Sequence, residues 1–127
     1  MDVQRLLRLA REMLPFAYAP YSDYRVGAAL LTTEGEIFKG VNIENASLGL
    51  TICAERVALS AAVAAGYRSF SLLAIAADGE SKPLPCGACR QVLGEFSRKL
   101  KVVVAGEEGE PLIFNLEELL PYPFKGS

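Results

Sequence analysis

The chain has 127 residues, of which 51% are hydrophobic, and its 13 basic and 15 acidic side chains give a net charge of −2. This length suits one folded domain, and the hydrophobic content excludes a disordered chain. The absence of a basic run argues against nucleic-acid binding, and the longest nearly unbroken apolar stretch, residues 57–65, is about half a membrane span.

Histidine is absent from the chain. This excludes Ser-His and Cys-His catalytic arrangements and any zinc site that needs imidazole. A general base must therefore be Glu, Asp, Cys, Lys or Tyr. Residues 1–14 place arginines within the apolar pattern and show no signal-peptide cleavage site, so we expect no signal peptide and a cytoplasmic location.

The first half of the chain predicts a helix followed by a hairpin. Asp2 and Pro15 bound the helical pattern, and Thr33-Glu34-Gly35 supplies the hairpin turn. The predicted elements are a helix over 2–14, a loop rich in proline and aromatic residues over 15–24, and strands over 26–32 and 36–43.

A second helix is expected to begin with Thr51 as its N-cap and to end at Gly66. Past Arg56 it is apolar on all sides, so it must be covered on all sides, by the sheet and by a neighbouring subunit. The later elements predicted are a strand over 72–77, a helix over 87–99, strands over 101–105 and 112–114, and a helix over 116–120 capped by Asn115.

Helices that alternate with strands after an initial hairpin predict an α/β fold. We expect a mixed sheet of about five strands with helices on both faces, and a single domain over residues 1–127.

Three cysteines form the most informative pattern. Cys86 and Cys89 flank a Gly turn at a predicted helix start, and Cys53 lies near the start of another helix. Helix N-termini stabilise thiolates, and three sulfur ligands leave open the position that a catalytic zinc needs for water. The alternatives are small buried thiols or a redox-active Cys-x-x-Cys pair.

Glu55 follows Cys53 by two residues. Side chains in the first turn tilt toward the helix N-terminus, so Glu55 could approach water at the metal without binding the metal itself. The alternative is a carboxylate that only stabilises the helix dipole. Three thiolates and Zn²⁺ sum to −1, so a positive group is required nearby. Arg56 and, second, Arg90 are the candidates, and surface ion pairs are the alternative.

Several segments resemble the cytidine deaminase family. The sequences from Cys53 to Arg56 and from Pro85 to Gln91 match its zinc signature. The segments FAYAPYSDYRV, GVNIENASLGL and LLPYPF extend the resemblance over nearly the whole chain. The short homotetrameric type, with three Cys ligands, is most similar, whereas the longer dimeric type has one His.

The resemblance implies a three-layer α/β/α fold and one zinc ion per chain, held by Cys53, Cys86 and Cys89, with Glu55 as the proton shuttle. The implied reaction is hydrolytic deamination of cytidine and 2′-deoxycytidine to the uridines, with release of ammonia, in pyrimidine salvage. Alternatives are a blasticidin-S-type aminonucleoside deaminase, a nucleic-acid editing deaminase and a non-catalytic zinc-stabilised interaction protein.

The resemblance also implies the substrate contacts. Asn42 and Glu44, which share a face of the predicted strand, would bind the ribose, although such a pair is often a solvated strand edge. Leu48 stands where many members have Tyr. The remaining implied contacts are Tyr24 in the pocket wall, backbone groups near Ala46 and Ala54 at the base, and Phe124 over the pyrimidine in an adjacent subunit's site.

Overall fold

The computed structural model describes residues 2–79 and 82–126. Its helices are α1 (Val3–Glu12), α2 (Ala54–Ala64), α3 (Gly87–Phe96) and α4 (Leu116–Leu119), with 3₁₀ turns η1 (Leu14–Phe16) and η2 (Leu48–Leu50). Its strands are β1 (Val26–Thr32), β2 (Ile37–Val41), β3 (Phe70–Ala77), β4 (Lys101–Ala105) and β5 (Pro111–Asn115).

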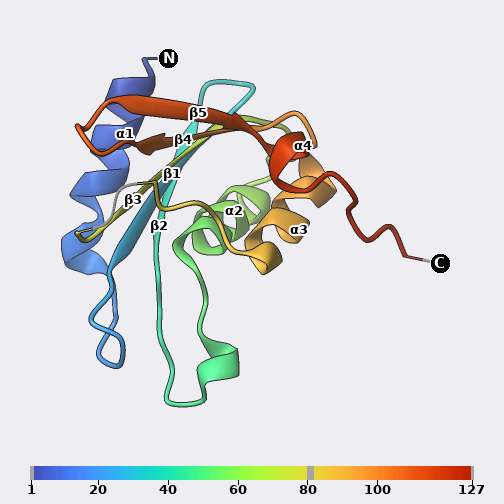
Figure 1. The fold of residues 1–127 in the computed structure, drawn as a ribbon. Helices are drawn as coiled ribbons and strands as arrows, with labels where there is room; N and C mark the ends of the chain where they lie inside the picture. Colours follow the sequence, from blue (N-terminus) through green and yellow to red (C-terminus); the bar gives the residue numbers. More distant parts are fainter. Residues whose placement is uncertain (1, 80–81, 127) are drawn as a thin grey trace.

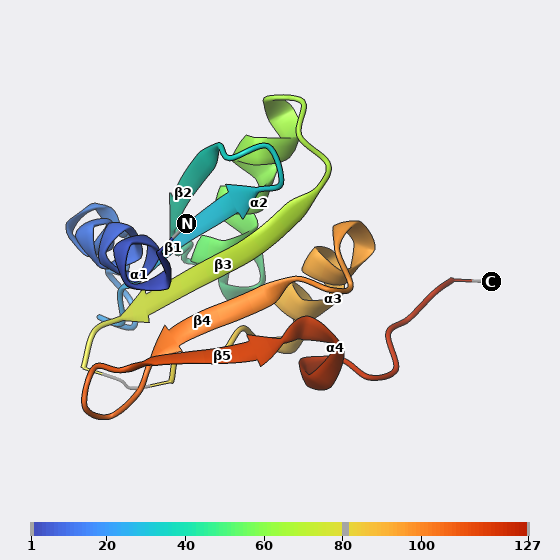
Figure 2. The same cartoon turned by 90° about the horizontal axis from the view of Figure 1, so that it is seen from above.

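The five strands form one mixed sheet in the order β2-β1-β3-β4-β5 (Figure 2). β3 and β4 are parallel, and the other neighbouring pairs are antiparallel. The continuous apolar run of β3 lies at the centre of the sheet, as its sequence predicts for a strand covered on both faces.

Helices cover both faces of this sheet (Figure 1). The alternation of side chains along β1 directs Ala28 and Leu30 into the core beneath α2 and α3, and Ala29 and Leu31 into the core beneath α1. The predicted mixed sheet between two helical layers is therefore confirmed.

Two glycines let helices approach the sheet closely. A Cβ at Gly27 would lie 2.1 Å from the Ala10 carbonyl oxygen in α1. A Cβ at Gly40 would lie 2.4 Å from the Ala54 carbonyl oxygen in the first turn of α2. Gly40 therefore fixes the depth at which the N-terminus of α2 lies on the sheet.

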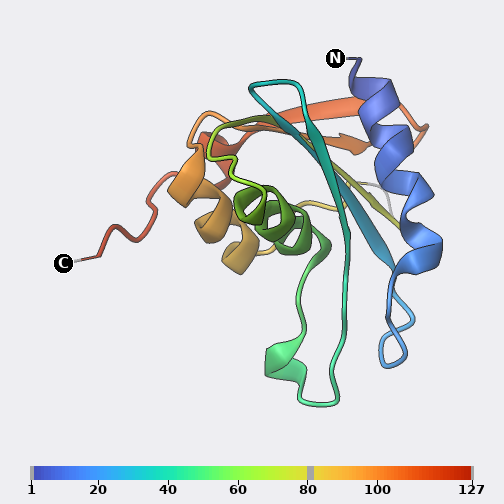
Figure 3. The same cartoon turned by 180° about the vertical axis from the view of Figure 1, so that it is seen from behind.

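The predicted start of α2 is wrong. Cys53, not Thr51, is the N-cap residue. The Thr51 hydroxyl instead accepts a hydrogen bond from the Asn45 backbone N–H, 3.2 Å away. Residues 43–52 form an arm that projects from the sheet (Figure 3), and an isolated bridge between Ile43 and Ile52 holds its base together.

The predicted strand over 36–43 is also too long, since β2 ends at Val41. Asn42 and Glu44 consequently lie beyond the strand, at the base of the arm. No helix in the described parts of the chain combines the length and apolar character that crossing a membrane requires.

Candidate active site

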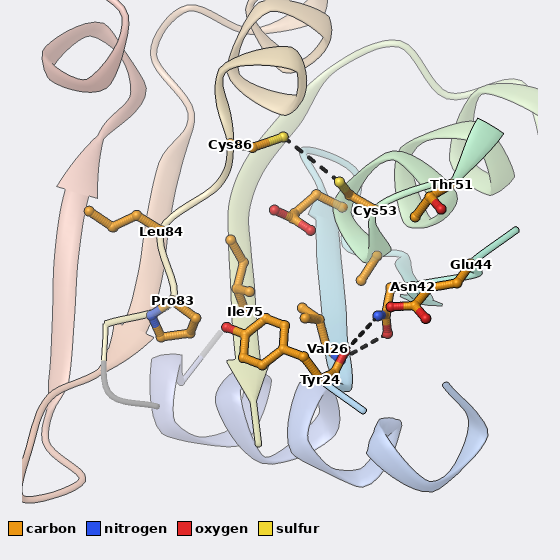
Figure 4. A pocket seen from close by; sticks show the side chains of 12 residues that line it. Tyr24, Val26, Asn42, Glu44, Thr51, Cys53, Ile75, Pro83, Leu84 and Cys86 are labelled. Carbon is orange, nitrogen blue, oxygen red and sulfur yellow. Dashed lines mark hydrogen bonds between the residues drawn. The ribbon is translucent and has the colours of Figure 1, made fainter. Parts of the chain in front are cut away.

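Two helix N-termini bring the three cysteines together. Cys53 and Cys86 are the N-cap residues of α2 and α3, and Cys89 lies in the first turn of α3. Their sulfur atoms all lie within 4.8 Å of one another. Figure 4 shows Cys53 and Cys86 turned toward each other, with their Sγ atoms 3.8 Å apart.

This arrangement fits a zinc ion. Tetrahedral zinc with Zn–S bonds of about 2.3 Å places its sulfur ligands about 3.8 Å apart. The Cys53–Cys86 distance agrees with that value, and thiolate is a preferred zinc ligand. Three sulfur ligands leave one tetrahedral position for water or substrate, because the metal-ligating cluster found in the described residues contains no fourth member.

The thiol pKa values of Cys53 and Cys89 are shifted in opposite directions. The pKa of Cys53 is lowered to about 5, first because the Cys89 thiol donates a hydrogen bond to its sulfur and also because Arg56 lies beside it. The same interaction, together with burial, raises the pKa of Cys89. Cys53 therefore ionises before Cys89.

Arg56 faces the cysteine cluster. Its Nη2 donates to Cys53 Sγ over 3.6 Å. Its Nε is buried and has no hydrogen-bond partner among the described residues. A guanidinium in this position is placed to offset the negative charge of the thiolates, and the part of Arg56 in charge balance stays a prediction.

Arg90 points elsewhere. Its Nε donates to the Pro85 carbonyl oxygen over 2.7 Å, and its Nη1 donates to the Leu119 carbonyl oxygen over 2.8 Å. These bonds fix the backbone that leads into Cys86 and tie α3 to α4. Its predicted part in charge balance stays a prediction.

Glu55 is a buried carboxyl, with 5% of its surface exposed. Burial is the main reason why its pKa is raised, and the negative charge of Cys53 adds to this, whereas Arg56 opposes it. A carboxyl whose pKa is raised takes up a proton more readily than an ordinary carboxylate, which suits a group that accepts a proton and returns it.

Glu55 opens into a cavity of about 260 Å³ between the sheet and the starts of α2 and α3. Of the residues predicted to form the site, those that line this cavity are Tyr24, Asn42, Glu44, Cys53, Ala54, Glu55 and Cys86. Its wall also includes residues that the sequence analysis missed, among them Pro83 and Leu84. Their position directly before Pro85-Cys86 could have indicated this, because the residues that precede a predicted metal ligand must lie close to the site.

Asn42 and Glu44 organise the polar end of the cavity (Figure 4). Asn42 accepts from the Val26 N–H over 2.9 Å and donates to the Tyr24 carbonyl over 2.8 Å. Glu44 accepts from the backbone N–H groups of Tyr21 and Ser22 and from the Ser22 hydroxyl.

The Ser22 hydroxyl is the main reason why the pKa of Glu44 is lowered, so this carboxylate stays ionised. An amide and a carboxylate each offer about four hydrogen-bonding positions. The bonds named above use two of those on Asn42 and three on Glu44, so both side chains can still bind a ligand hydroxyl.

Ala46 and Phe124 do not line the cavity of their own chain. Ala46 is exposed on the projecting arm. Phe124 lies in the C-terminal tail, with 78% of its surface exposed, beside a separate hollow against α3. Leu48, at the tip of the arm, is 74% exposed.

Comparison with known proteins identifies the family. The family model "Cytidine and deoxycytidylate deaminase zinc-binding region" matches residues 1–106. The cytidine deaminase of Sporosarcina psychrophila is 44% identical over 98% of this chain and 92% of its own length. That of Halalkalibacterium halodurans is 45% identical over 98% of this chain and 95% of its own length.

Solved structures agree with the sequence matches. The crystal structure of cytidine deaminase from Burkholderia pseudomallei has a TM-score of 0.92 and 44% identity, over 98% of this chain and all of that one (100%). The cytidine deaminase from Mycobacterium tuberculosis has a TM-score of 0.87 and 35% identity, over 99% of both chains. The chain therefore belongs to the zinc-binding family of cytidine and deoxycytidylate deaminases.

Proposed function

We propose that this protein deaminates cytidine and 2′-deoxycytidine by hydrolysis in the cavity beside Glu55. The products are the uridines and ammonia, and the reaction serves pyrimidine salvage. The observation that carries this proposal is that a buried carboxyl and two cysteines of the three-cysteine cluster line one cavity. The relatives named above are cytidine deaminases that match this chain over nearly its whole length. Zinc, one ion per chain, is the cofactor.

Glu55 moves the protons of this reaction. Zinc held by Cys53, Cys86 and Cys89 supplies a Lewis acid that makes water a strong nucleophile near neutral pH. Glu55 accepts a proton from the attacking water and gives it to N3 of the pyrimidine as oxygen bonds to C4. Glu55 then takes the proton of the new C4 hydroxyl and gives it to the exocyclic amine. The C4–N bond breaks as the C4 carbonyl forms, and ammonia leaves.

The polar end of the cavity holds the sugar. Asn42 and Glu44 bind the ribose hydroxyls, and backbone groups of Ala54 read the base. Tyr24 forms part of the wall, where its hydroxyl adds a polar group. The remaining contacts come from a second subunit of a homotetramer, through backbone groups near Ala46 and the ring of Phe124.

We also propose that residues 1–127 form one deaminase domain. A cytoplasmic location suits it, because thiolates that hold zinc must stay reduced. We propose no nucleic-acid partner and no membrane partner.

The direct test is the loss of cytidine absorbance together with release of ammonia by the zinc-loaded protein. We expect turnover of cytidine and 2′-deoxycytidine. Faster turnover of blasticidin S would favour the aminonucleoside deaminase. No turnover of any nucleoside would favour a zinc-stabilised interaction protein.

Phe124→Ala should weaken cytidine binding roughly 5- to 150-fold while zinc stays bound, because stacking of an aromatic ring on a base contributes about 1–3 kcal/mol. Substrate affinity and zinc content are the measurements. Tyr122→Ala is the matched control, since Tyr122 is an aromatic residue of the same tail and is 92% exposed. A lower melting temperature with unchanged affinity would mean that Phe124 only stabilises its own subunit.

Sharing of sites between subunits is tested by complementation. Glu55→Gln and Phe124→Asp are each expected to be inactive, and mixed oligomers should regain activity where one site receives an intact Glu55 and an intact Phe124. Absence of recovery, with mixed oligomers verified by native mass spectrometry, would mean that each site is built from a single chain.

Arg56→Gln should move the acid limb of the pH–activity profile to higher pH. Arg56 lowers the pKa of Glu55, so its removal raises that pKa, and the ionised carboxylate then requires a higher pH. Arg68→Gln is the control at the other end of α2, where Arg68 bonds the carbonyl oxygens of Val63 and Tyr67. An unshifted profile with normal activity would place Arg56 outside the catalytic machinery.

A further inference from the structure

The C-terminal tail leaves the body of the molecule after α4, and Figures 1 and 3 both show it extending beyond α3. Such a segment would ordinarily be loose. Here side chains of α3 and of the turn that follows it hold the tail at two places. Arg90 and Arg98 donate to the carbonyl oxygens of Leu119 and Leu120, each over 2.8 Å, where α4 ends.

The second point of attachment is at Phe124 itself. Gln91 Nε2 donates to the Phe124 carbonyl oxygen over 2.8 Å, and Gln91 Oε1 accepts from the Phe124 N–H over 3.1 Å. One side-chain amide thus pairs with both backbone groups of one residue, as neighbouring residues do in an antiparallel hydrogen-bonded pair. Two such bonds fix the orientation of the Phe124 backbone as well as its position.

The residues between the two attachments limit the freedom of the chain. Pro121 and Pro123 have fixed φ angles and no N–H groups that need a partner. Their only intervening neighbour is Tyr122, for whose N–H no hydrogen bond is found in the described part of the chain. The segment is therefore a short, stiff connection between two fixed ends.

The Phe124 ring does not account for this ordering, because 78% of the residue is exposed and its ring is not buried in its own chain. The Phe124 backbone is thus fixed while its aromatic side chain stays exposed, and this suits a ring that contacts another molecule. Gln91 also lies two residues after the metal ligand Cys89, on the same helix. One helix therefore carries Cys86 and Cys89 of the cysteine cluster together with the glutamine that binds the tail.

We infer that Gln91 is a positioning residue, which holds the backbone of Phe124 so that its ring is directed toward the substrate cavity of a second copy of the chain. This inference rests on the proposed function, in which Phe124 contacts the substrate. Gln91 itself touches no substrate and acts only through Phe124.

The test compares Gln91→Leu with Gln4→Leu in the zinc-loaded, full-length protein. The chain has one other glutamine, Gln4, which is exposed on α1 and provides the same chemical change away from the tail. We expect Gln91→Leu to raise the KM for cytidine roughly 2- to 13-fold, the scale of one hydrogen bond, with kcat and zinc content unchanged. Gln4→Leu should leave all three values unchanged.

Combination with Phe124→Ala separates positioning from general structural support. If Gln91 acts through the ring, Gln91→Leu should add nothing to the KM of the Phe124→Ala protein. An equal increase in both backgrounds would overturn the inference, as would a normal KM for Gln91→Leu when Phe124→Ala raises it. A normal KM for Phe124→Ala would instead contradict the proposed substrate contact.

Amide hydrogen exchange in the unsubstituted protein provides a test that does not depend on the folding of a variant. The Phe124 N–H should exchange more slowly than the Tyr122 N–H, because only the former is bonded to Gln91. Gln91→Glu keeps the acceptor and replaces the donor, so it should preserve part of this protection. Equal exchange rates for Phe124 and Tyr122 in the unsubstituted protein would overturn the inference.

Discussion

Replacing Glu55 by Gln should lower kcat for cytidine by at least ~10²-fold, the lower end of the range for general acid–base groups. Gln preserves the shape of this buried side chain but cannot accept the proton of the attacking water or return it to the amine. The thiols are not altered, so zinc content measured by elemental analysis should stay at about one per chain.

Glu117→Gln is the matched control for that variant. Both residues are carboxylates in the first turn of a helix, Glu55 in α2 and Glu117 in α4. If Glu55 only stabilised the helix dipole, both substitutions would lower the stability of the protein by similar, small amounts and would leave turnover unchanged. Near-normal turnover of the Glu55→Gln protein would therefore remove Glu55 from the mechanism.

Much of the sheet follows from local patterns in the sequence. The apolar run within β3 requires cover on both faces, and the Thr33-Glu34-Gly35 turn joins β1 to β2 in a hairpin. The pattern over Lys101–Ala105 predicts β4 with its observed bounds. These elements are predictable because burial and turn chemistry act over a few consecutive residues.

The start of α2 depends on contacts that no local pattern contains. Thr51 is a favourable N-cap residue type, but its hydroxyl bonds the arm residue Asn45, six positions earlier. The bridge between Ile43 and Ile52 keeps this part of the chain extended until Cys53. The shift has a chemical consequence, since it places a thiol of the three-cysteine cluster directly at the helix N-terminus, where ionisation is favoured.

The substrate side of the site was only partly predictable. The family resemblance indicates Asn42 and Glu44, whereas a shared strand face alone would suggest a solvated edge, and both residues lie beyond the end of β2. Their side chains reach the cavity because Asn42 bonds the backbone around Tyr24 and Glu44 bonds that of Tyr21 and Ser22. Bonds between segments about twenty residues apart leave no periodic trace in a sequence.

Removing zinc with a chelator should abolish deamination, and one equivalent of zinc per chain should restore it. The chain contains only three cysteines, all in the cluster, so a thiol reagent reports directly on the site. In the zinc-loaded protein the thiols should be unreactive, and chelation should expose all three as activity is lost. Full activity of a metal-free preparation would contradict the assignment of the site.

The order in which the freed thiols react provides a sharper test of the electrostatics. The thiolate is the nucleophile, so at neutral pH Cys53, with a pKa of about 5, should be alkylated before Cys89. Cys89 should react last, because its pKa is raised and its side chain is fully buried. Arg56→Gln should slow the alkylation of Cys53, since the guanidinium that stabilises its thiolate is lost. Mass spectrometry of the alkylated peptides measures this order. Preferential labelling of Cys89 would mean that Cys89, not Cys53, loses its thiol proton more readily, and this would contradict the prediction.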